Sequence, residues 1–386
     1  MKKQIVNARI VTPDGILENG VLRFCDGIIE YLGAEAEADI PTVDADGAYL
    51  MAGFVDIHCH GGAGYDFMDA TPEQMRTIAA FHLSHGTTTL LPTTMTDTWQ
   101  AIYGVLDRYA ALGEDTLTMV GVHLEGPWLS PAQCGAQDTS KMDTPSEEKL
   151  RLLMEKYPFI RRISAAPELD GGMAVGRLGR DLGLVMSVGH SDADFDTTVA
   201  AADNGYTLMT HLYSGMSVVH RKNAYRIAGA VEAALVDDRI FVELIADGCH
   251  LPAGLLKLVY KCKGAERIAL VTDAMRGAGL ADGQETMLGR MTDGVPCIIE
   301  DGVAKLPDRQ SFAGSVATTD RLLRTMHTLA QIPLCECSKM LSQTPALILG
   351  LADRGSIEVG KRADFVLLDN ELKIINTYMK GEENAS

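Results

Sequence analysis

Short apolar segments recur along the middle of the chain, and stretches with helical periodicity separate most of them. The apolar segments are short enough for strands buried on both faces of a sheet. The eight segments are residues 54–57, 87–91, 119–124, 162–165, 184–188, 208–212, 241–245 and 268–271. The helix-like stretches include residues 98–111, 147–157, 194–202 and 253–261. Eight strands alternating with helices predict an α/β fold, a (β/α)8 TIM barrel, over residues 51–351.

The two ends of the chain have a different pattern, in which short strand-like runs are separated by turn residues. Such runs occur at residues 5–11, 20–24 and 27–33, and again at 355–360 and 363–369. Neither end segment, 1–50 or 352–386, is long enough to bury a good core alone. We therefore expect the two segments to form one small β-sandwich, with the barrel inserted between them.

Composition and charge narrow the class of protein. The chain has 386 residues, 46% of them hydrophobic, and a formal net charge of −18. This charge argues against a nucleic-acid partner and against an anionic membrane surface. No apolar run reaches the ~18 residues that span a bilayer, and no apolar signal region follows the first lysines. The eight cysteines contain no C-x-x-C pair. We therefore expect a soluble cytoplasmic enzyme with reduced thiols.

Potential metal ligands follow the predicted strands. His58 and His60 end the first strand, where alternation sends both side chains to the same side. An isolated H-x-H pair is more often part of an ordinary loop, but Glu125, His190 and His211 stand at the ends of three other strands. The carboxyl ends of barrel strands meet at one face, so these five groups should converge. Imidazole and carboxylate suit Zn²⁺, or Fe²⁺, Mn²⁺ or Co²⁺, and the set would serve one ion or two.

Asp273 directly follows the last predicted strand. A carboxylate at this position can accept a proton from a metal-activated water and pass it to a leaving group. The metal would lower the pKa of that water towards ~7 and polarise the carbonyl under attack. The alternative is a helix-capping aspartate. We predict that Asp273 is the catalytic acid and base.

A dense basic run follows the sixth predicted strand of this acidic chain. Arg221, Lys222 and Arg226 provide the charge, and an anionic group, most naturally a phosphate, would be held there. The alternative is a solvated segment without a ligand. His250, after the seventh strand, is a second candidate for the same ligand.

Residues 275–315 form a long insertion after the last predicted strand. Hairpin-like pieces at 295–299 and 303–306 are followed by small residues that include Ala313 and Gly314. Small residues allow the backbone to approach a ligand closely, so we predict that this segment reaches the site.

Taken together, these motifs resemble the N-acetylglucosamine-6-phosphate deacetylase family of the amidohydrolase superfamily, over essentially the whole chain. Glu125 is specific, because other branches of the superfamily often use a carboxylated lysine as a metal ligand. The matching segments are residues 52–61, 123–128, 188–191, 210–213, 246–250, 271–274, 313–315 and 360–366.

The resemblance implies roles for particular residues. Glu125, His190 and His211 would be the main metal ligands, and His58 and His60 would hold a second ion in members that have one. The resemblance also implies that Asp273 is the acid and base and that His250 contacts a sugar phosphate. It implies a homodimer in which a basic residue reaches the phosphate from the neighbouring subunit.

Three departures from the family pattern affect the substrate site. Where the family has Asn-Ala after the sixth strand, this chain has Ser214-Gly215. In the family these positions help to hold the phosphate, so the resemblance implies an altered contact at Ser214 and Gly215. The family's R-E-P-G pattern is replaced by residues 221–226, so any of Arg221, Lys222 and Arg226 is a candidate for the phosphate contact. Gly-Ala-His becomes Gly135-Ala136-Gln137, and Gln137 would donate a hydrogen bond without carrying charge.

We therefore predict a divalent-metal-dependent deacetylase of an N-acetylated amino-sugar phosphate. N-acetylglucosamine 6-phosphate is the expected substrate. N-acetylgalactosamine 6-phosphate, a non-phosphorylated N-acyl sugar and another amide of the superfamily remain alternatives. A metal-free barrel that serves as a binding protein is disfavoured, because none of the five potential ligands is missing.

Overall fold

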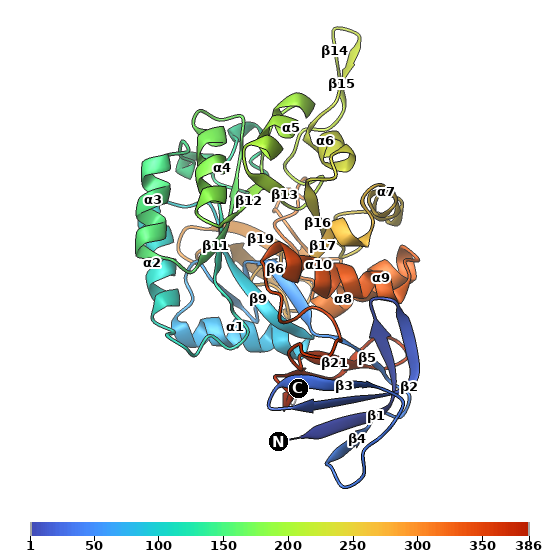
Figure 1. Cartoon of the computed structure of the whole chain (residues 1–386). Helices are drawn as coiled ribbons and strands as arrows, with labels where there is room; N and C mark the ends of the chain where they lie inside the picture. The colour runs from blue at the N-terminus through green and yellow to red at the C-terminus, as the bar shows by residue number, and fades with distance from the viewer. Residues whose placement is uncertain (1, 385–386) are drawn as a thin grey trace.

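The middle of the chain forms a barrel of eight parallel strands in the computed structural model, which describes residues 2–384 (Figure 1). The strands are β6 (Phe54–Cys59), β9 (Thr87–Thr94), β10 (Val122–Glu125), β11 (Ile160–Ala165), β12 (Val185–Val188), β13 (Tyr206–Met209), β16 (Phe241–Ile245) and β17 (Ile268–Val271). Each overlaps its predicted apolar segment, with bounds that differ by up to three residues. The last strand returns to the first, since the Asp273 amide donates to the His58 carbonyl at 2.9 Å. The predicted (β/α)8 barrel is confirmed.

Helices cover the outside of the barrel, and the strands are buried on both faces. All residues of β6, β9, β10 and β17 are buried, as expected for strands that are covered on both faces, although β6, β9 and β10 also contain polar residues. The α-helices are α1 (Pro72–Ser84), α2 (Trp99–Ala110), α3 (Glu147–Lys156), α4 (Gly172–Asp181), α5 (Phe195–Asp203), α6 (Ala230–Val236), α7 (Ala253–Lys263), α8 (Thr319–Arg324), α9 (Leu334–Ser338) and α10 (Thr344–Ile348). In the described part of the chain, no helix is both long and apolar enough to cross a membrane.

Strands from both ends of the chain meet in a separate sheet below the barrel (Figure 1). They are β1 (Lys3–Thr12), β2 (Gly15–Cys25), β3 (Ile28–Gly33), β4 (Thr42–Asp44), β5 (Tyr49–Ala52), β21 (Phe365–Leu368), β22 (Ile374–Met379) and β23 (Glu382–Asn384). The sheet has eight strands, and antiparallel pairing of β21 with β5 joins its two halves. It has its own apolar core, which includes Ile10, Leu50 and Phe365. The expectation that the two ends combine is confirmed; residues 1, 385 and 386 of the end segments lie outside the described residues.

Two insertions extend from the carboxyl face of the barrel. After β13, the strands β14 (His220–Lys222) and β15 (Tyr225–Ile227) form a hairpin that projects from the body of the molecule (Figure 1). After β17, the strands β18 (Glu285–Leu288), β19 (Val295–Glu300) and β20 (Val303–Lys305) form a small antiparallel sheet. Near β6, the two-residue strands β7 (Gly61–Gly62) and β8 (Tyr65–Asp66) pair.

Candidate metal centre and substrate pocket

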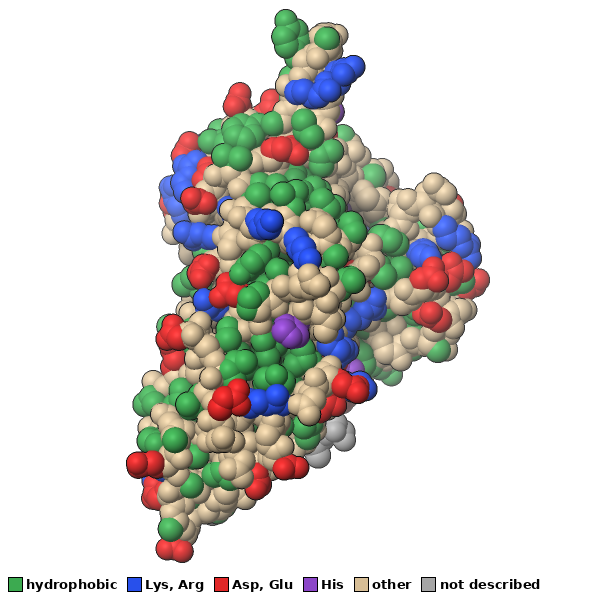
Figure 2. All heavy atoms as spheres, turned by 90° about the vertical axis from the view of Figure 1, so that its right-hand side faces the viewer, with side chains coloured by type: hydrophobic (Ala, Val, Ile, Leu, Met, Phe, Trp, Pro, Cys, Tyr) green, Lys and Arg blue, Asp and Glu red, His purple; other side chains and the backbone are tan. Residues whose placement is uncertain are grey.

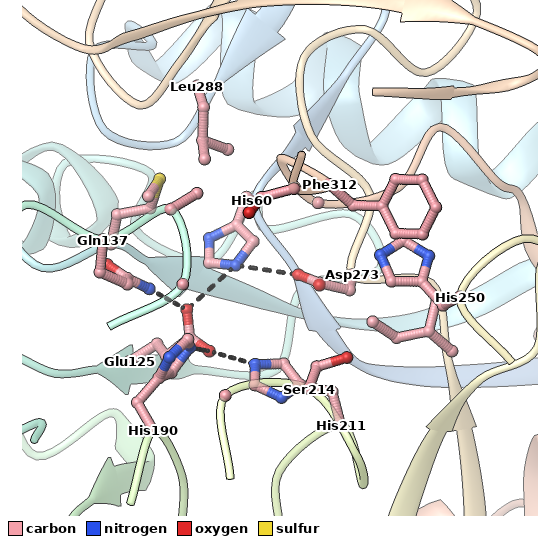
Figure 3. A pocket seen from close by; sticks show the side chains of 17 residues that line it. His60, Glu125, Gln137, His190, His211, Ser214, His250, Asp273, Leu288 and Phe312 are labelled. Atoms are coloured by element: carbon pink, nitrogen blue, oxygen red, sulfur yellow. Dashed lines mark hydrogen bonds and ion pairs between the residues drawn. The ribbon is translucent and has the colours of Figure 1, made fainter. Parts of the chain in front are cut away.

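A cavity of about 240 Å³ opens at the carboxyl ends of the barrel strands (Figure 3). It brings together most of the residues that the sequence singled out. The predicted residues that line it are His60, Glu125, Ala136, Gln137, His190, His211, Ser214, Gly215, His250, Asp273 and Gly314. Residues from the insertion after β17, Leu288, Ser311 and Phe312, complete one wall.

Five predicted residues do not line this cavity. His58 lies fully buried directly beneath it, and Ala313 is also fully buried. Arg221, Lys222 and Arg226 lie on the exposed β14–β15 hairpin. Figure 2 shows Lys and Arg side chains on this protrusion at the top of the molecule. The cavity of one chain therefore receives no contribution from the basic hairpin of the same chain.

The Glu125 carboxylate lies at the centre of the predicted ligands. Its Oε1 is 2.9 Å from His211 Nε2, 3.4 Å from His190 Nε2 and 3.5 Å from His58 Nε2. Its Oε2 is 3.4 Å from His60 Nε2. Four imidazoles thus direct the same ring nitrogen towards one carboxylate, as Figure 3 shows for three of them.

Asp273 forms a second centre beside the first. Its Oδ1 is 3.1 Å from His60 Nε2 and 3.4 Å from His58 Nε2. The two histidine nitrogens are themselves 3.2 Å apart. Asp273 is 7% exposed and lines the cavity, so its carboxylate can reach both the ligand cluster and a substrate.

The carboxylates and imidazoles of the cluster shift one another's pKa values. Burial acts to raise the pKa of Asp273, but the charges of His58 and His60 lower it to about 2. The pKa of Glu125 is likewise held well below its usual range by the surrounding imidazoles, against the effect of burial. In turn, burial acts to lower the pKa of His211, but Glu125 raises it to about 9. The positive charge of the neighbouring imidazoles thus keeps two buried carboxylates ionised.

Three of the site residues have a left-handed backbone, and each stands two positions after its strand. The φ angles are +46° at His190, +25° at His211 and +47° at Asp273. Such values cost roughly 1–3 kcal/mol for a residue with a side chain and persist only where the surroundings impose them. This shared turn is a feature of the residues that enter the site from β12, β13 and β17.

Beneath the cavity lies a buried charge pair that the sequence analysis missed. The Arg162 guanidinium donates to the Glu243 carboxylate, and both side chains are fully buried. Burial acts to raise the pKa of Glu243, but Arg162 and His58 lower it to about 2. The signal was present in the sequence, because Glu243 stands inside an apolar strand where a charged residue needs a partner.

Gln137 lines the cavity, but the protein itself engages both ends of its amide. The amide nitrogen donates to Glu125 Oε2 at 2.7 Å, and the amide oxygen accepts from the Thr96 amide at 2.9 Å. Gln137 therefore holds Glu125 in place, and a hydrogen bond to a substrate carbonyl would have to compete with these contacts.

His250 forms the opposite side of the cavity. Its Nδ1 is 2.8 Å from Asp247 Oδ2, and its backbone amide donates to Asp247 Oδ1 at 2.8 Å. The Phe312 ring lies against the imidazole with centroids 4.7 Å apart. Asp247 thereby fixes the ring, and the other nitrogen, Nε2, is free for a ligand.

The residues present fit a divalent cation. Two groups of buried ligand atoms, each within 4.8 Å of one another, are His58, Glu125 and His211, and His58, His60 and Asp273. Imidazole nitrogens with carboxylate oxygens are the donors that zinc and its neighbours take. A third buried group, Asp56, Cys59 and His82, lies further from the cavity.

Comparison with known proteins agrees with this geometry. The profile of the Amidohydrolase family, whose members generally use a divalent metal, matches residues 49–384. An N-acetylglucosamine-6-phosphate deacetylase of Lysinibacillus sphaericus is 32% identical over 382 residues, covering 98% of this chain and 96% of the relative. An N-acetylgalactosamine-6-phosphate deacetylase of Escherichia coli O157:H7 is also 32% identical, covering 97% of each chain.

A solved structure shares the entire fold. It is an N-acetyl-D-glucosamine-6-phosphate deacetylase mutant of Mycobacterium smegmatis in complex with N-acetyl-D-glucosamine-6-phosphate. It superposes with a TM-score of 0.91 at 30% identity and covers 99% of each chain. On the match of profile, sequence and structure over nearly the full length, the chain belongs to the amidohydrolase family.

Proposed function

We propose that the protein hydrolyses the N-acetyl group of N-acetylglucosamine 6-phosphate and releases glucosamine 6-phosphate and acetate. One observation carries this proposal. A carboxylate, Asp273, and a buried metal-capable cluster around Glu125 share one cavity in a chain whose full-length relatives are amino-sugar-phosphate deacetylases. The enzyme would be a hydrolase of a linear amide bond.

Glu125, His190 and His211 would hold the main ion, and His58 and His60 would hold a second ion beside Asp273. The contacts of His190 and His211 with Glu125 Oε1 support the first group. The contacts of His58 and His60 with Asp273 Oδ1 support the second. His58 also lies within reach of the first group. Zinc is the metal we expect, ahead of iron, manganese or cobalt. When bound, the metal supplies an activated water and polarises the acetyl carbonyl.

Asp273 would move the proton between the reacting groups. In our proposal, its carboxylate oxygen takes the proton from the attacking water and then gives it to the amine as the carbon–nitrogen bond breaks. The low pKa of Asp273 keeps the carboxylate ionised, which is the form that can accept a proton. Its position between the ligand cluster and the open cavity supports this role.

The far side of the cavity would hold the sugar and its phosphate. His250 would donate to the phosphate from Nε2, because Asp247 occupies Nδ1. We assign Ser214, Gly215 and the backbone of the 313–314 segment to further substrate contacts; Ala136 and Gln137 would lie near the acetyl group. Within the described residues, the cavity lining contains no lysine or arginine, so a dianion needs charge from elsewhere.

A homodimer would supply that charge. The β14–β15 hairpin carries Arg221, Lys222 and Arg226 away from its own cavity, in a form suited to reach a neighbouring subunit. Exposed apolar side chains on the same protrusion, Val219 at 50% and Tyr225 at 76% exposure, would be covered there. We also place the enzyme in the cytoplasm, where its eight free thiols would stay reduced.

A second candidate substrate is N-acetylgalactosamine 6-phosphate. The galactosamine-specific relative is as similar as the glucosamine-specific one, at 32% identity. Ser214 and Gly215, at which this chain differs from the glucosamine family pattern, line the cavity, so its substrate site departs from that pattern.

Acetate release from four sugars tests the proposal. The two 6-phosphorylated epimers and their unphosphorylated forms would be compared, with the bound metal measured on the same sample. We expect metal-dependent turnover of a phosphorylated sugar, with N-acetylglucosamine 6-phosphate preferred. A metal-loaded protein that is inactive on all four sugars would overturn the proposed substrate class, and preference for the galacto epimer would select the second candidate.

A further inference from the structure

We propose that Glu243 is a positioning residue that holds His58 and His211 in the orientation that binds metal, with Arg162 as its counter-charge. This inference rests on the metal binding of the proposed function. Glu243 is fully buried and does not line the cavity, so it acts through the two histidines rather than on a substrate.

The first contact fixes the ring of His58. Glu243 Oε2 is 3.2 Å from His58 Nδ1, and a carboxylate can only accept, so Nδ1 carries the proton. The other nitrogen, Nε2, then points towards Glu125 and Asp273, and His58 belongs to both metal-capable groups. A histidine that donates one ring N–H to a carboxylate is fixed in tautomer and orientation and becomes a better ligand.

The second contact fixes the backbone of His211. The same oxygen, Glu243 Oε2, accepts from the His211 amide at 3.1 Å, and the Glu243 carbonyl accepts from the Leu212 amide at 2.9 Å. His211 has a φ of +25°, which an unsupported residue would leave. One side chain on β16 therefore supports ligands that come from β6 and from the end of β13.

Arg162 allows this carboxylate to be buried. Besides Glu243, its guanidinium donates to Ser187 Oγ at 2.9 Å, Thr210 Oγ1 at 3.1 Å and the Ile57 carbonyl at 3.1 Å. These contacts hold the arginine beneath the predicted metal ligands and orient it towards Glu243. Well-packed apolar residues often stabilise a core as much as a buried ion pair. The contacts of Glu243 with His58 and His211 indicate that the Arg162–Glu243 pair has a role other than stability.

Two variants separate positioning from folding. Glu243→Gln keeps the shape of the side chain. The single amide oxygen of a glutamine could accept from both histidines only if its NH₂ group faced the Arg162 guanidinium, where two donors would oppose each other. The double variant Glu243→Leu with Arg162→Met removes both charges, so no unpaired charge is left in the core.

Asp320→Asn is the matched control. Asp320 is also a buried carboxylate that pairs with an arginine, Arg324 at 2.7 Å, and a histidine, His85 at 3.3 Å. It lies on α8, and it contacts none of the predicted metal ligands. Asp320→Asn therefore removes a buried carboxylate charge, as Glu243→Gln does, but leaves the predicted metal ligands unchanged.

The experiment measures zinc affinity by chelator competition and the visible spectrum of the cobalt-loaded protein, with the unfolding temperature recorded for each variant. We expect about 10- to 100-fold weaker zinc binding and an altered cobalt spectrum in both Glu243 variants. Asp320→Asn should lower the unfolding temperature and leave zinc affinity and the cobalt spectrum unchanged.

Three results would overturn the inference. One is wild-type zinc affinity in Glu243→Gln. Another is a double variant that is as stable as the wild type and also binds zinc with wild-type affinity. That result would show that the Arg162–Glu243 pair has only a structural role. The third, which needs no variant to fold, is a crystal structure of the zinc-loaded native chain in which Glu243 has left His58 and the His211 amide. A wild-type chain that binds no metal would instead refute the proposed function.

Discussion

The ligand cluster and the basic hairpin both contain residues predicted to act on the substrate, yet they are built in opposite ways. Every member of the cluster, from His58 to Asp273, is buried at or just beyond a strand end, and its neighbours determine its orientation. The hairpin residues Arg221, Lys222 and Arg226 are exposed, and they extend away from the cavity. Chemistry that needs fixed geometry is therefore placed in the barrel. The charge that we propose to reach a phosphate is placed on the exposed hairpin.

The comparison also separates what one chain provides from what an assembly provides. The cluster is complete within a single chain, because all its ligand atoms come from one barrel. The proposed phosphate end of the cavity would be incomplete, since His250 is its only predicted basic contact among the described lining residues. Changes in the cluster should abolish the chemistry, whereas changes in the hairpin should weaken binding.

Metal removal should have the largest effect. Because the cluster holds two ionised carboxylates that need a cation, we expect activity to disappear after dialysis against a chelator and to return with zinc. The unfolding temperature should fall in parallel, since an ion that binds only the folded state stabilises it. Acetate release and calorimetry on the same samples check this. Full activity in metal-free protein would contradict the metal-dependent proposal.

Asp273→Asn should be next. The amide cannot accept the proton, so we expect kcat to fall by about 10²- to 10⁴-fold. The bound metal must be counted in the variant, because Asp273 lies 3.1 Å from His60 Nε2 and its loss could also disturb the ion. A decrease below about tenfold with metal retained would remove Asp273 from its proton-transfer role.

Neutralising the hairpin should produce a smaller effect, confined to phosphorylated substrates. We expect the triple variant Arg221→Ala, Lys222→Ala and Arg226→Ala to raise KM about 10- to 100-fold, the value of charged hydrogen bonds. Unphosphorylated sugars and the unfolding temperature should be unaffected.

Mixing this triple variant with Asp273→Asn tests whether the β14–β15 hairpin of one subunit completes the site of its neighbour. If each hairpin serves the neighbouring subunit, hybrid dimers contain one complete site, and re-associated mixtures should regain about one quarter of wild-type activity. No recovery in dimers that have exchanged subunits would show that the arm does not complete the neighbouring site.

Gln137→Leu, a change beside the ligand cluster, should have the smallest effect on substrate binding and turnover. Because the amide holds Glu125 and the Thr96 backbone, we expect metal affinity to fall about tenfold while KM changes less than about twofold. Metal competition and steady-state kinetics separate the two quantities. A large rise in KM with unchanged metal affinity would instead support the substrate contact that the sequence suggested.

The sequence predicted the barrel and the cluster because both follow from local patterns. Apolar runs mark strands that are buried on both faces, and the carboxyl ends of such strands must meet, which brought His58, Glu125 and His211 together. Which buried polar residues pair within the core could not be predicted from the sequence. Arg162 and Glu243 are 81 residues apart, and nothing local to either one names the other.

The direction of the hairpin was equally hidden. Its two short strands are set by Asn223 and Ala224, both with positive φ, but the path of the arm depends on how the flanking segments leave the barrel. A basic run in an acidic chain indicates an anion without indicating which chain's cavity will receive it. The role of Gln137 depended in the same way on contacts with Thr96 and Glu125.

The sheet that joins the two ends of the chain has a consequence for biosynthesis. β5 pairs with β21, which the ribosome makes only after the whole barrel. At about 5–20 residues per second, β5 waits tens of seconds for its partner. During this time Leu50 and Met51, fully buried in the finished protein, belong to an open strand edge. Ribosome-bound chains stalled before β21 should therefore show protease-sensitive N-terminal strands, so that the sheet encoded first is the last part of the molecule to be completed.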